Sequence, residues 1–437
     1  MKLSLLNSFF AIGLALSNAS AADPKKPWSA FQNSGSPVVS QDLPVEWTPE
    51  SVAWKASIKG YGQSTALVSG EHVYVTSTSG DNKEKYHVTA LDLKSGDPLW
   101  KLDFTNPTPE KNTTYVSRAA PTPVLDDNAC YVFFEGGLVA AVSHAGEELW
   151  SRDLVAQYGA ISARHGLASS LEHNDDRIFV WVERSDAPYL LALDKKTGST
   201  VWKTAGLGST TWSSPRLMDF GDEAHLVCSA SGKIAGFDPA KGTKLWEFDA
   251  IANNTSCSPM PVGDGKFLIG ASDGRGEENA GKGSVYNGVI EVTKAEDGQW
   301  QVEYQWHAKR ATSSFGSPVV YDGKAYFVNR QGVLYKNDLQ TGEESKPQRL
   351  GCGGIWATPL VSNNRLYLFG QKGATSVVDL ESGEEIAVNQ LWESDAADAG
   401  NDQQRGPGSM GGGVLYAASP AGEMLILRRG DTVYAIR

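Results

Sequence analysis

The length, composition and charge of the chain narrow the classes of protein to which it can belong. Its 437 residues are 41% hydrophobic and 21% charged, which is typical of a globular protein. The 39 Lys and Arg residues are outnumbered by 51 Asp and Glu residues. A chain this acidic is poorly suited to hold nucleic acid or an anionic membrane surface by electrostatics. The 46 Gly, 20 Pro and 13 Trp indicate many short strands, tight turns and regularly placed aromatic rings.

The first residues are typical of a leader for export. Lys2 gives a positive start, residues 3–16 are mostly apolar, and Ala19, Ser20 and Ala21 are small. The apolar stretch is shorter than the roughly 20 residues that span a membrane, so we expect a cleaved secretory signal over 1–21. Cleavage would leave 437 − 21 = 416 residues and, with Lys2 lost, a net charge of 38 − 51 = −13.

The cleavage site has no neighbouring cysteine that could carry the acyl chain of a lipoprotein, and no later segment has the length and apolarity of a transmembrane span. We therefore expect a periplasmic or secreted protein. The four cysteines are widely spaced and form no CxxC pair, so a thiolate metal site is not predicted. Cys130, Cys228 and Cys257 stand in strand-like runs and are expected to be small buried hydrophobic residues. A Cys228–Cys257 disulfide is the alternative in an oxidising compartment. The seven His show no HxH or HExxH spacing, so no metal site is predicted from them.

An internal repeat is the strongest pattern in the chain. Five Asp-x-x-x-Gly turns share one spacing, namely Asp92–Gly96, Asp194–Gly198, Asp238–Gly242, Asp338–Gly342 and Asp379–Gly383. A tryptophan follows the glycine by four residues at Trp100, Trp202 and Trp246, and the Gly146–Trp150 pair keeps this interval. Upstream, a Ser/Thr-Pro pair opens an extended run at Thr122-Pro123, Ser214-Pro215, Ser258-Pro259, Ser317-Pro318 and Thr358-Pro359.

Each part of the repeat has a physical role in a four-stranded unit of about 50 residues. Proline lacks the N–H of a central ladder, so it is expected at the start of an edge strand, here the innermost strand lining a channel. The aspartate can accept backbone N–H bonds across the turn between the third and fourth strands, while the glycine takes a positive φ. The tryptophan on the outermost strand can bury a large face against the next unit. Radial stacking of such sheets predicts a β-propeller.

Counting units predicts eight blades. Seven units start near Ser64, Pro121, Gly166, Trp212, Cys257, Gly316 and Ala357. The eighth, over 414–436, supplies three strands, and 51–58 at the other end of the chain supplies the missing outer strand, with Trp54 in the docking position. We therefore predict an all-β, eight-bladed propeller of four-stranded antiparallel blades over 47–437. It is closed by an N-terminal strand that completes the C-terminal blade, and 22–46 forms an extended lead-in segment. Seven blades is the alternative.

The repeat resembles a known family pattern. The runs YLLALDKKTGSTVW (189–202) and VTALDLKSGDPLW (88–100) resemble the pyrroloquinoline-quinone-like (PQQ-like) repeat, and the resemblance covers nearly the whole mature chain. It implies an eight-bladed propeller shared by two groups, the quinoprotein alcohol dehydrogenases and the non-catalytic outer-membrane-protein assembly lipoproteins. The dehydrogenases resemble one another in an adjacent Cys-Cys pair, a calcium site and a catalytic Asp. No two cysteines are adjacent here, and no positions match the calcium ligands or the base.

The resemblance therefore favours an exported, non-catalytic binding or scaffold protein that mediates protein–protein or small-ligand binding in the cell envelope. We expect a monomer that binds envelope or secreted proteins, with no cofactor and no catalytic residues. The alternative is a quinoprotein oxidoreductase that uses PQQ and calcium on an alcohol or a sugar. Carbohydrate binding or processing is a third interpretation, suggested only by aromatic residues at the channel mouth.

The loops that enter the innermost strands are expected to gather on one face of a propeller, around the channel mouth. They would bring together a set of seven residues: Arg118, Arg164, His165, Trp212, Asn254, Phe315 and Trp356. Two arginines and three aromatic rings could hold a planar anion by charge-assisted hydrogen bonds and stacking. The alternative is that these residues cap strands and plug the channel. Two enlarged loops, 79–86 and 273–287, are expected on the same face.

Overall fold

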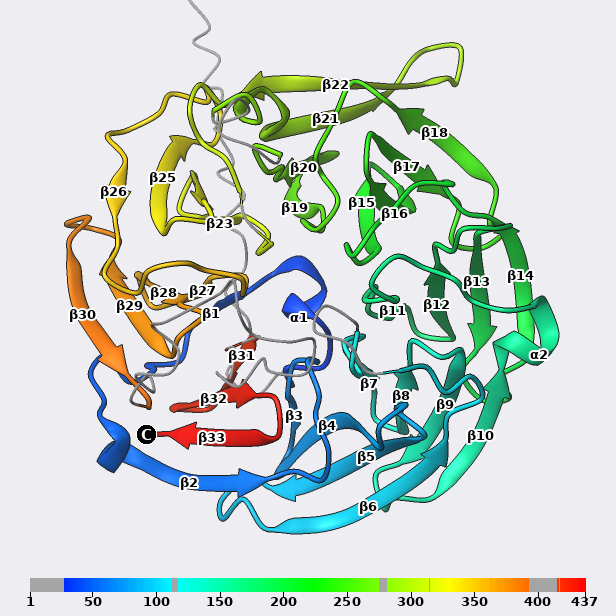
Figure 1. The fold of residues 1–437 in the computed structure, drawn as a ribbon. Coiled ribbons are helices and arrows are strands. Elements are labelled where there is room, and N and C mark those ends of the chain that lie inside the picture. The colour runs from blue at the N-terminus through cyan, green and yellow to red at the C-terminus, as the bar shows by residue number, and fades with distance from the viewer. Residues whose placement is uncertain (1–26, 112–116, 275–280, 314, 393–414, 416) are drawn as a thin grey trace, which may run out of the picture.

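A computed structural model describes residues 27–111, 117–274, 281–313, 315–392, 415 and 417–437. Eight β-sheets surround a central axis as the blades of a propeller (Figure 1). Seven sheets have four strands, and one gains a fifth from β1 (Val38–Val39). The predicted all-β, eight-bladed architecture is confirmed, and the seven-bladed alternative is wrong. The predicted leader, 1–21, lies outside the described residues.

The blades follow one another along the chain, with strands running from the axis outward. The first four blades are β3 (Leu67–Ser69), β4 (His72–Ser79), β5 (Lys85–Asp92), β6 (Pro98–Thr105); β7 (Val124–Leu125), β8 (Ala129–Phe133), β9 (Leu138–Ser143), β10 (Glu148–Asp153); β11 (Glu172–His173), β12 (Arg177–Val182), β13 (Tyr189–Asp194), β14 (Thr200–Ala205); and β15 (Arg216–Phe220), β16 (Glu223–Ala230), β17 (Lys233–Phe237), β18 (Lys244–Phe248).

The last four blades keep this order. They are β19 (Met260–Gly263), β20 (Lys266–Ile269), β21 (Gly288–Lys294), β22 (Trp300–His307); β23 (Val319–Tyr321), β24 (Lys324–Val328), β25 (Val333–Asp338), β26 (Gln348–Arg349); β27 (Leu360–Ser362), β28 (Arg365–Phe369), β29 (Ala374–Asp379), β30 (Glu385–Gln390); and β31 (Ala417–Ala421), β32 (Met424–Arg429), β33 (Thr432–Ile436) with β2 (Val52–Ser57). Helix is confined to short turns, among them α1 (Gln32–Gly35), α2 (Leu154–Tyr158), η1 (Pro49–Ser51) and η3 (Ser284–Tyr286).

The ring is closed by the two ends of the chain, as the sequence predicted. β2 pairs antiparallel with β33 and forms the outer strand of the C-terminal blade, with Trp54 opposite Ala435. Each of the five Ser/Thr-Pro pairs leads directly into the innermost strand of its blade, which is the predicted place for a residue without an N–H.

An outer ring of contacts joins neighbouring blades through tryptophan and glycine. The indole of the outer strand lies against the glycine of the next blade's turn, so closely that a Cβ on that glycine would come within 2.5–2.7 Å of the ring. The indole N–H also donates to a carbonyl of the same turn, at 2.8–3.0 Å. The pairs with this geometry are Trp54 with Gly96, Trp100 with Gly146, Trp150 with Gly198, Trp202 with Gly242, and Trp306 with Gly342. Glycine is thus required both for its positive φ and for close approach.

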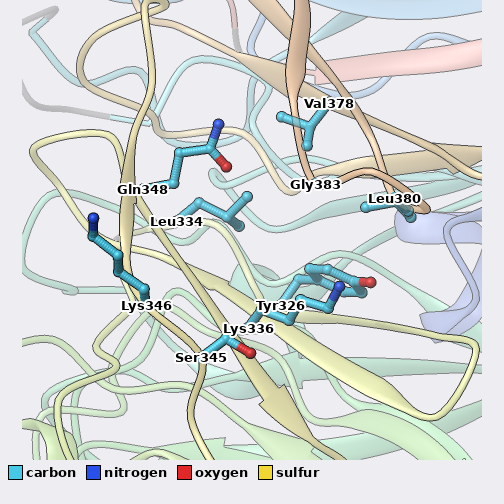
Figure 2. A pocket seen from close by; sticks show the side chains of 9 residues that line it. All are labelled: Tyr326, Leu334, Lys336, Ser345, Lys346, Gln348, Val378, Leu380 and Gly383. Carbon is cyan, nitrogen blue, oxygen red and sulfur yellow. The ribbon is translucent and has the colours of Figure 1, made fainter.

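Besides the joint after β30, where Ala387 stands at the tryptophan position, two joints of the outer ring depart from this geometry. Trp246 is buried against Phe267 of the next blade, but its indole N–H donates to Nδ1 of His225 in its own blade, at 3.1 Å. The next blade has no Asp-x-x-x-Gly turn to receive this indole, because residues 295–299 form a shorter turn instead. The other departure is Gly383, where a Cβ would meet no described atom within 4 Å and a pocket lies open (Figure 2).

An inner ring joins the same blades through hydroxyl groups. In blades two to seven, the hydroxyl of one Ser or Thr near the start of the inner strand accepts the backbone N–H of its counterpart in the preceding blade, at 2.9–3.0 Å. The chain of donors and acceptors runs from Thr65 to Thr122, Ser170, Ser214, Ser258, Ser317 and Thr358. The hydroxyl in the Ser/Thr-Pro pair therefore links blades, in addition to the role of the proline.

The four cysteines are all buried thiols that form no disulfide, so the alternative of a Cys228–Cys257 disulfide is wrong. Burial raises the pKa of the Cys257 thiol to about 12, which keeps it protonated and unreactive at neutral pH. Within the described ranges, no helix has both the length and the apolarity needed to cross a membrane.

Candidate functional site at the channel and its mouth

The segment that precedes the first blade folds into the centre of the propeller. α1 lies at the axis in Figure 1, and β1 pairs in parallel with β27, the innermost strand of its blade. The carbonyl of Trp28 accepts the N–H of Val68 at 3.0 Å, and the carbonyl of Ser29 accepts that of Leu125 at 2.8 Å. The predicted extended lead-in thus runs through the channel before it reaches β2 at the rim of the disc.

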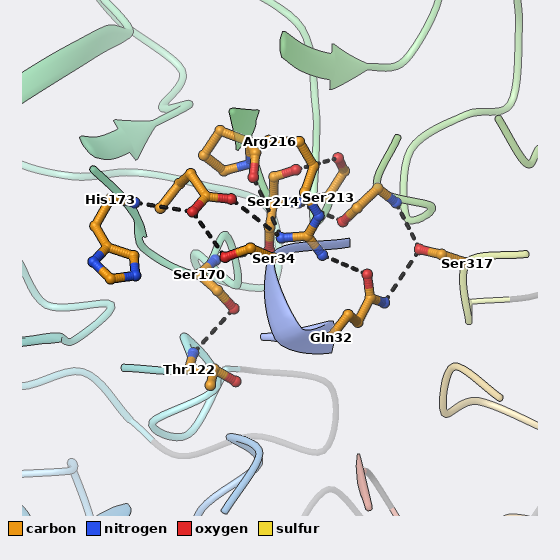
Figure 3. A network of polar contacts seen from close by, with 12 residues as sticks. Gln32, Ser34, Thr122, Ser170, His173, Ser213, Ser214, Arg216 and Ser317 are labelled. Atoms are coloured by element: carbon orange, nitrogen blue, oxygen red, sulfur yellow. Dashed lines mark hydrogen bonds and ion pairs between the residues drawn. The ribbon is translucent and has the colours of Figure 1, made fainter. Parts of the chain in front are cut away.

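The side chains of α1 bond to blades on several sides of the channel (Figure 3). The Gln32 Oε1 accepts from Arg216 Nη2 at 2.5 Å, and its Nε2 donates to Ser317 Oγ at 3.2 Å and to the Thr358 hydroxyl. Ser34 Oγ donates to Glu172 Oε1 at 3.0 Å. Four blades are therefore linked through two residues of the N-terminal segment.

A buried ion pair completes this axial network. Arg216 Nη1 lies 3.8 Å from Glu172 Oε2, and both side chains are at most 2% exposed. Burial raises the pKa of Glu172, against the opposing effect of the Arg216 charge, and burial lowers the pKa of Arg216 to about 10. Arg216 and Glu172 thus face each other as groups of opposite formal charge in a buried site, so removing one partner alone would be costly.

The backbone of α1 is strained. Gln32, Asn33 and Ser34 have φ values of 53°, 47° and 52°, in the left-handed region that costs a non-glycine residue roughly 1–2 kcal/mol. Such strain persists only where surrounding contacts determine the conformation. The bonds of Gln32 and Ser34 to the channel wall supply those contacts.

The loops that enter the inner strands form a continuous arc on one face, which we call the rim face. Ser117 N–H donates to the carbonyl of His165 at 2.9 Å, and Trp212 N–H to that of Thr255 at 2.8 Å. Gln63 N–H donates to the carbonyl of Arg118 at 3.1 Å. Loops that are 40 to 55 residues apart in sequence therefore lie side by side.

The structure groups most of the predicted rim residues into neighbouring pairs. The rings of His165 and Trp212 have centroids 5.8 Å apart, and those of Phe315 and Trp356 are 5.0 Å apart. The Arg118 guanidinium stacks over the ring of Tyr61, with its carbon 3.6 Å from the ring centroid. Tyr61 was not among the predicted residues, because it lies upstream of the first recognised repeat.

Two predicted rim residues are placed differently. Asn254 is fully buried, and its amide donates to Ser229 Oγ at 2.9 Å and to the Ala230 carbonyl at 2.7 Å, while its oxygen accepts the Gly232 N–H at 2.9 Å. These bonds hold a loop in place, as the strand-capping alternative anticipated. Arg164 is exposed on its loop.

The enlarged loop at 79–86 contributes a residue that the sequence pattern did not reveal. Lys83 is 2% exposed, and its ammonium lies 3.6 Å from Glu135 Oε1 and donates to the Ser117 carbonyl at 3.2 Å. The other carboxylate oxygen of Glu135 accepts the Ala119 N–H at 3.1 Å. Burial raises the pKa of Glu135, an effect that the Lys83 charge opposes. This buried pair fixes the backbone on both sides of Arg118.

The channel does not fit a quinone with a calcium ion at the axis. The centre is occupied by α1 and β1, and the carboxylate in the axial network, Glu172, is neutralised by Arg216. Within the part of the chain that the structure describes, no three His, Cys, Asp or Glu side chains are grouped so that they could hold a metal ion. We therefore derive no chemistry through such a cofactor.

Comparison with known sequences shows the family. A family model described as "Outer membrane protein assembly factor BamB" matches residues 38–165, 119–348 and 287–434. BamB of Alkalilimnicola ehrlichii is 24% identical over 216 residues, which is 49% of this chain and 50% of that protein. BamB of Salmonella typhimurium is 26% identical over 196 residues, or 45% of each chain. The chain thus spans about half the length of the curated relatives it matches.

Solved structures show the same fold in two functional groups. BamB from Moraxella catarrhalis has a TM-score of 0.58 at 12% identity, covering 88% of this chain and 96% of that one. Quinohemoprotein alcohol dehydrogenase from Comamonas testosteroni has a TM-score of 0.60 at 11% identity, covering 94% and 80%. At these identities the likeness shows the fold alone, whereas the family model matches segments that together run from residue 38 to 434. The chain therefore belongs to the BamB family of PQQ-like-repeat propellers.

Proposed function

We propose that this protein is an exported, non-catalytic scaffold of the cell envelope that binds partner proteins through its rim face. The observation that carries the proposal is the filled channel. Because α1 and its bonds to Arg216, Ser317 and Glu172 occupy the axis, the rim loops are the surface left for recognition. Membership in the BamB family supports a role in outer-membrane-protein assembly, the activity named in the family's description.

The rim face has the chemistry of a protein interface. Aromatic residues and arginine are enriched at the centres of such interfaces and at their hot spots. Phe315 is 43% exposed beside Trp356, and Trp212 is half-buried beside His165. Arg118 is fixed by stacking on Tyr61, and its backbone is held by the Lys83–Glu135 pair, so little conformational freedom would be lost on binding.

The experiment that tests this proposal compares the mature chain with the double variant Arg118→Ala/Trp212→Ala. Each protein is immobilised and exposed to solubilised envelope proteins, and the bound proteins are quantified by mass spectrometry. We expect a defined set of assembly proteins to be captured and to fall at least about tenfold with the variant, corresponding to a loss of about 1.4 kcal/mol. The control is Lys241→Ala/Lys244→Ala in β18 and its turn, which lies away from the rim loops. Equal capture by all three proteins would place the function elsewhere.

A ligand-binding experiment separates the scaffold from the quinoprotein alternative. We expect no saturable rise in melting temperature when PQQ is added with or without Ca²⁺, because the axial position is filled by Gln32 and Arg216. A ligand that binds only the folded state must stabilise it, so a saturable and calcium-dependent rise would favour the oxidoreductase.

A further inference from the structure

The blade joint next to β26 lacks the outer-strand tryptophan that is present at six of the other joints. The turn Asp379–Gly383 keeps the spacing and the positive φ of the other turns, with φ of +77° at Gly383. At the five filled joints the glycine touches an indole, but at Gly383 a Cβ would meet no described atom within 4 Å. We call this open position the vacant slot.

The sequence of blade six explains why the slot is open. The position four residues after Gly342, where Trp100 follows Gly96, holds Lys346, and Pro347 follows it. The outer strand β26 is consequently only two residues long. Lys336 stands two residues before Asp338, where Ala90 stands two residues before Asp92 and pairs with Trp100. The Ala and Trp of a filled joint are thus both replaced by lysine.

The slot is a pocket of about 250 Å³ with an apolar floor. Figure 2 shows Tyr326 and Leu334 from one blade and Val378 and Leu380 from the next, with Gly383 between the latter two. A dry cavity of about 150 Å³ can hold benzene, so this volume accommodates a two-ring aromatic group. Both lysines line the pocket with Ser345 and Gln348; Lys336 is half-buried and Lys346 is exposed.

The slot also has a counterpart of the backbone carbonyl that accepts the indole N–H at the filled joints. At the filled joints the indole N–H donates to the carbonyl of the residue just after the aspartate of the turn, as Trp306 does to Leu339 at 2.8 Å and Trp54 does to Leu93 at 2.8 Å. The corresponding residue here is Leu380, which lines the pocket. The slot therefore offers both the apolar walls and the carbonyl that define a tryptophan joint.

No tryptophan of this chain is available to fill the slot. All 13 tryptophans of the sequence fall within the described residues, and none of them lines the pocket. A tryptophan in the slot would therefore come from another molecule.

We propose that the vacant slot binds a tryptophan side chain from a partner protein, inserted as the missing member of the outer ring. The two lysines that line the slot favour a partner segment in which acidic residues flank that tryptophan. Tryptophan is a common hot-spot anchor because it buries a large face and donates one hydrogen bond. The inference deepens the scaffold function proposed above by adding a docking point, but it does not involve the rim residues.

The test uses a fluorescein-labelled peptide, Asp-Glu-Trp-Glu-Asp, titrated with the mature protein and followed by fluorescence anisotropy. We expect saturable binding that weakens at least about tenfold when the Trp is replaced by Ala, and several-fold when it is replaced by 1-methyltryptophan, which cannot donate to Leu380. A peptide with Lys flanks should bind more weakly than the acidic one. Methyl resonances of Leu334, Val378 and Leu380 should shift during the wild-type titration, which locates the site without any variant.

A variant that restores the repeat gives the decisive comparison. Lys336→Ala/Lys346→Trp should fill the slot with a side chain of this protein and raise its melting temperature. The affinity for the acidic peptide should fall at least about tenfold. Lys241→Trp, which adds a surface tryptophan on another blade, is the matched control and should leave the affinity unchanged, as should Arg118→Ala/Trp212→Ala. Absence of saturable binding, or shifts confined to methyl groups outside the slot, would overturn the proposal. Loss of binding in the rim variant alone would assign the peptide to the rim face instead.

Discussion

Neighbouring blades are joined differently near the axis and at the circumference. Near the axis, Ser and Thr hydroxyls accept backbone N–H groups at 2.9–3.0 Å. At the circumference, five tryptophans cover five glycines. The blades converge at the axis and spread apart outward, as Figure 1 shows, so small polar groups suffice inside and large rings are needed outside to keep the interior close-packed.

The two rings also differ in how their contacts depend on one another. Each tryptophan joint stands alone, and the ring still closes although the joint at Gly383 has none. In the inner ring the Ser214 hydroxyl accepts from the Ser170 N–H, and the Ser214 backbone N–H donates to the Ser258 hydroxyl, so one residue takes part in two joints. Each joint of the outer ring thus makes a large and independent contribution to the free energy of unfolding. The contributions of the inner ring are smaller, and neighbouring ones share residues.

The largest effect is expected at an outer joint. Trp202→Ala removes a side chain that is 9% exposed and lies against Gly242, and should reduce the free energy of unfolding by about 3–5 kcal/mol. Urea unfolding followed by circular dichroism measures the loss. Lys346→Ala at the vacant slot is the control and should change stability by less than about 0.5 kcal/mol. Equal losses in the two variants would mean that Trp202 stabilises the folded protein no more than the exposed Lys346 does.

At the axis of the propeller, we expect a loss of unfolding free energy of similar or slightly smaller size. Arg216→Met leaves the buried carboxylate of Glu172 without its counter-charge, which typically costs about 3–5 kcal/mol. The double variant Arg216→Met/Glu172→Gln should recover part of that loss, because no isolated charge remains. If the single and double variants unfold at the same urea concentration, the two residues do not act as an ion pair.

A smaller effect is expected from one link of the inner ring. Ser214→Ala deprives the buried N–H of Ser170 of its acceptor, and an unsatisfied buried donor costs about 1–3 kcal/mol. Ser57→Ala, at an exposed position of β2, should be close to neutral by the same urea assay. Neutral behaviour of both variants would show that water replaces the missing hydroxyl.

The last effect is a change in pH dependence at the outer ring. His225 accepts the Trp246 indole N–H, and burial lowers the pKa of His225 to about 4, from an ordinary value near 6.5. Between these values the unfolded chain binds a proton that the folded protein does not, so stability is lost as the pH falls from 6.5 toward 4. His225→Gln removes this contribution and should flatten the slope of unfolding free energy against pH over that window. An unchanged slope would show that His225 titrates normally in the folded protein.

The sequence predicted those parts of the fold that depend on residues at fixed spacings within each repeat. The Asp-x-x-x-Gly spacing and the Ser/Thr-Pro pairs define turns and edge strands from a few neighbouring residues, as in Asp92, whose carboxylate accepts the N–H groups of Lys94 and Ser95 at 2.9 and 2.8 Å. Trp54 marked the N-terminal strand as the outer strand of the last blade, because it repeats the docking position. The rim residues followed from the same count of strands.

What the repeat could not reveal lies between parts of the chain that are far apart. Gln32 meets Arg216 and Ser317 across 184 and 285 residues, and nothing in a five-residue pattern relates them. Lys83 stands in an enlarged, polar loop, so its burial against Glu135 had no local signal. The vacant slot could have been suspected from Lys346 at a tryptophan position, but only the structure shows that, among the described residues, no other side chain contacts Gly383 in its place.

The sequence by itself determined the blade, the number of blades and the way the ring closes, because each depends on periodic hydrophobic and turn residues acting within about 50 positions. Only the tertiary structure decided the contents of the channel and the state of each joint between blades. Those depend on which side chains meet across the ring, where packing and the pairing of buried charges are set by three-dimensional distance and not by separation along the chain.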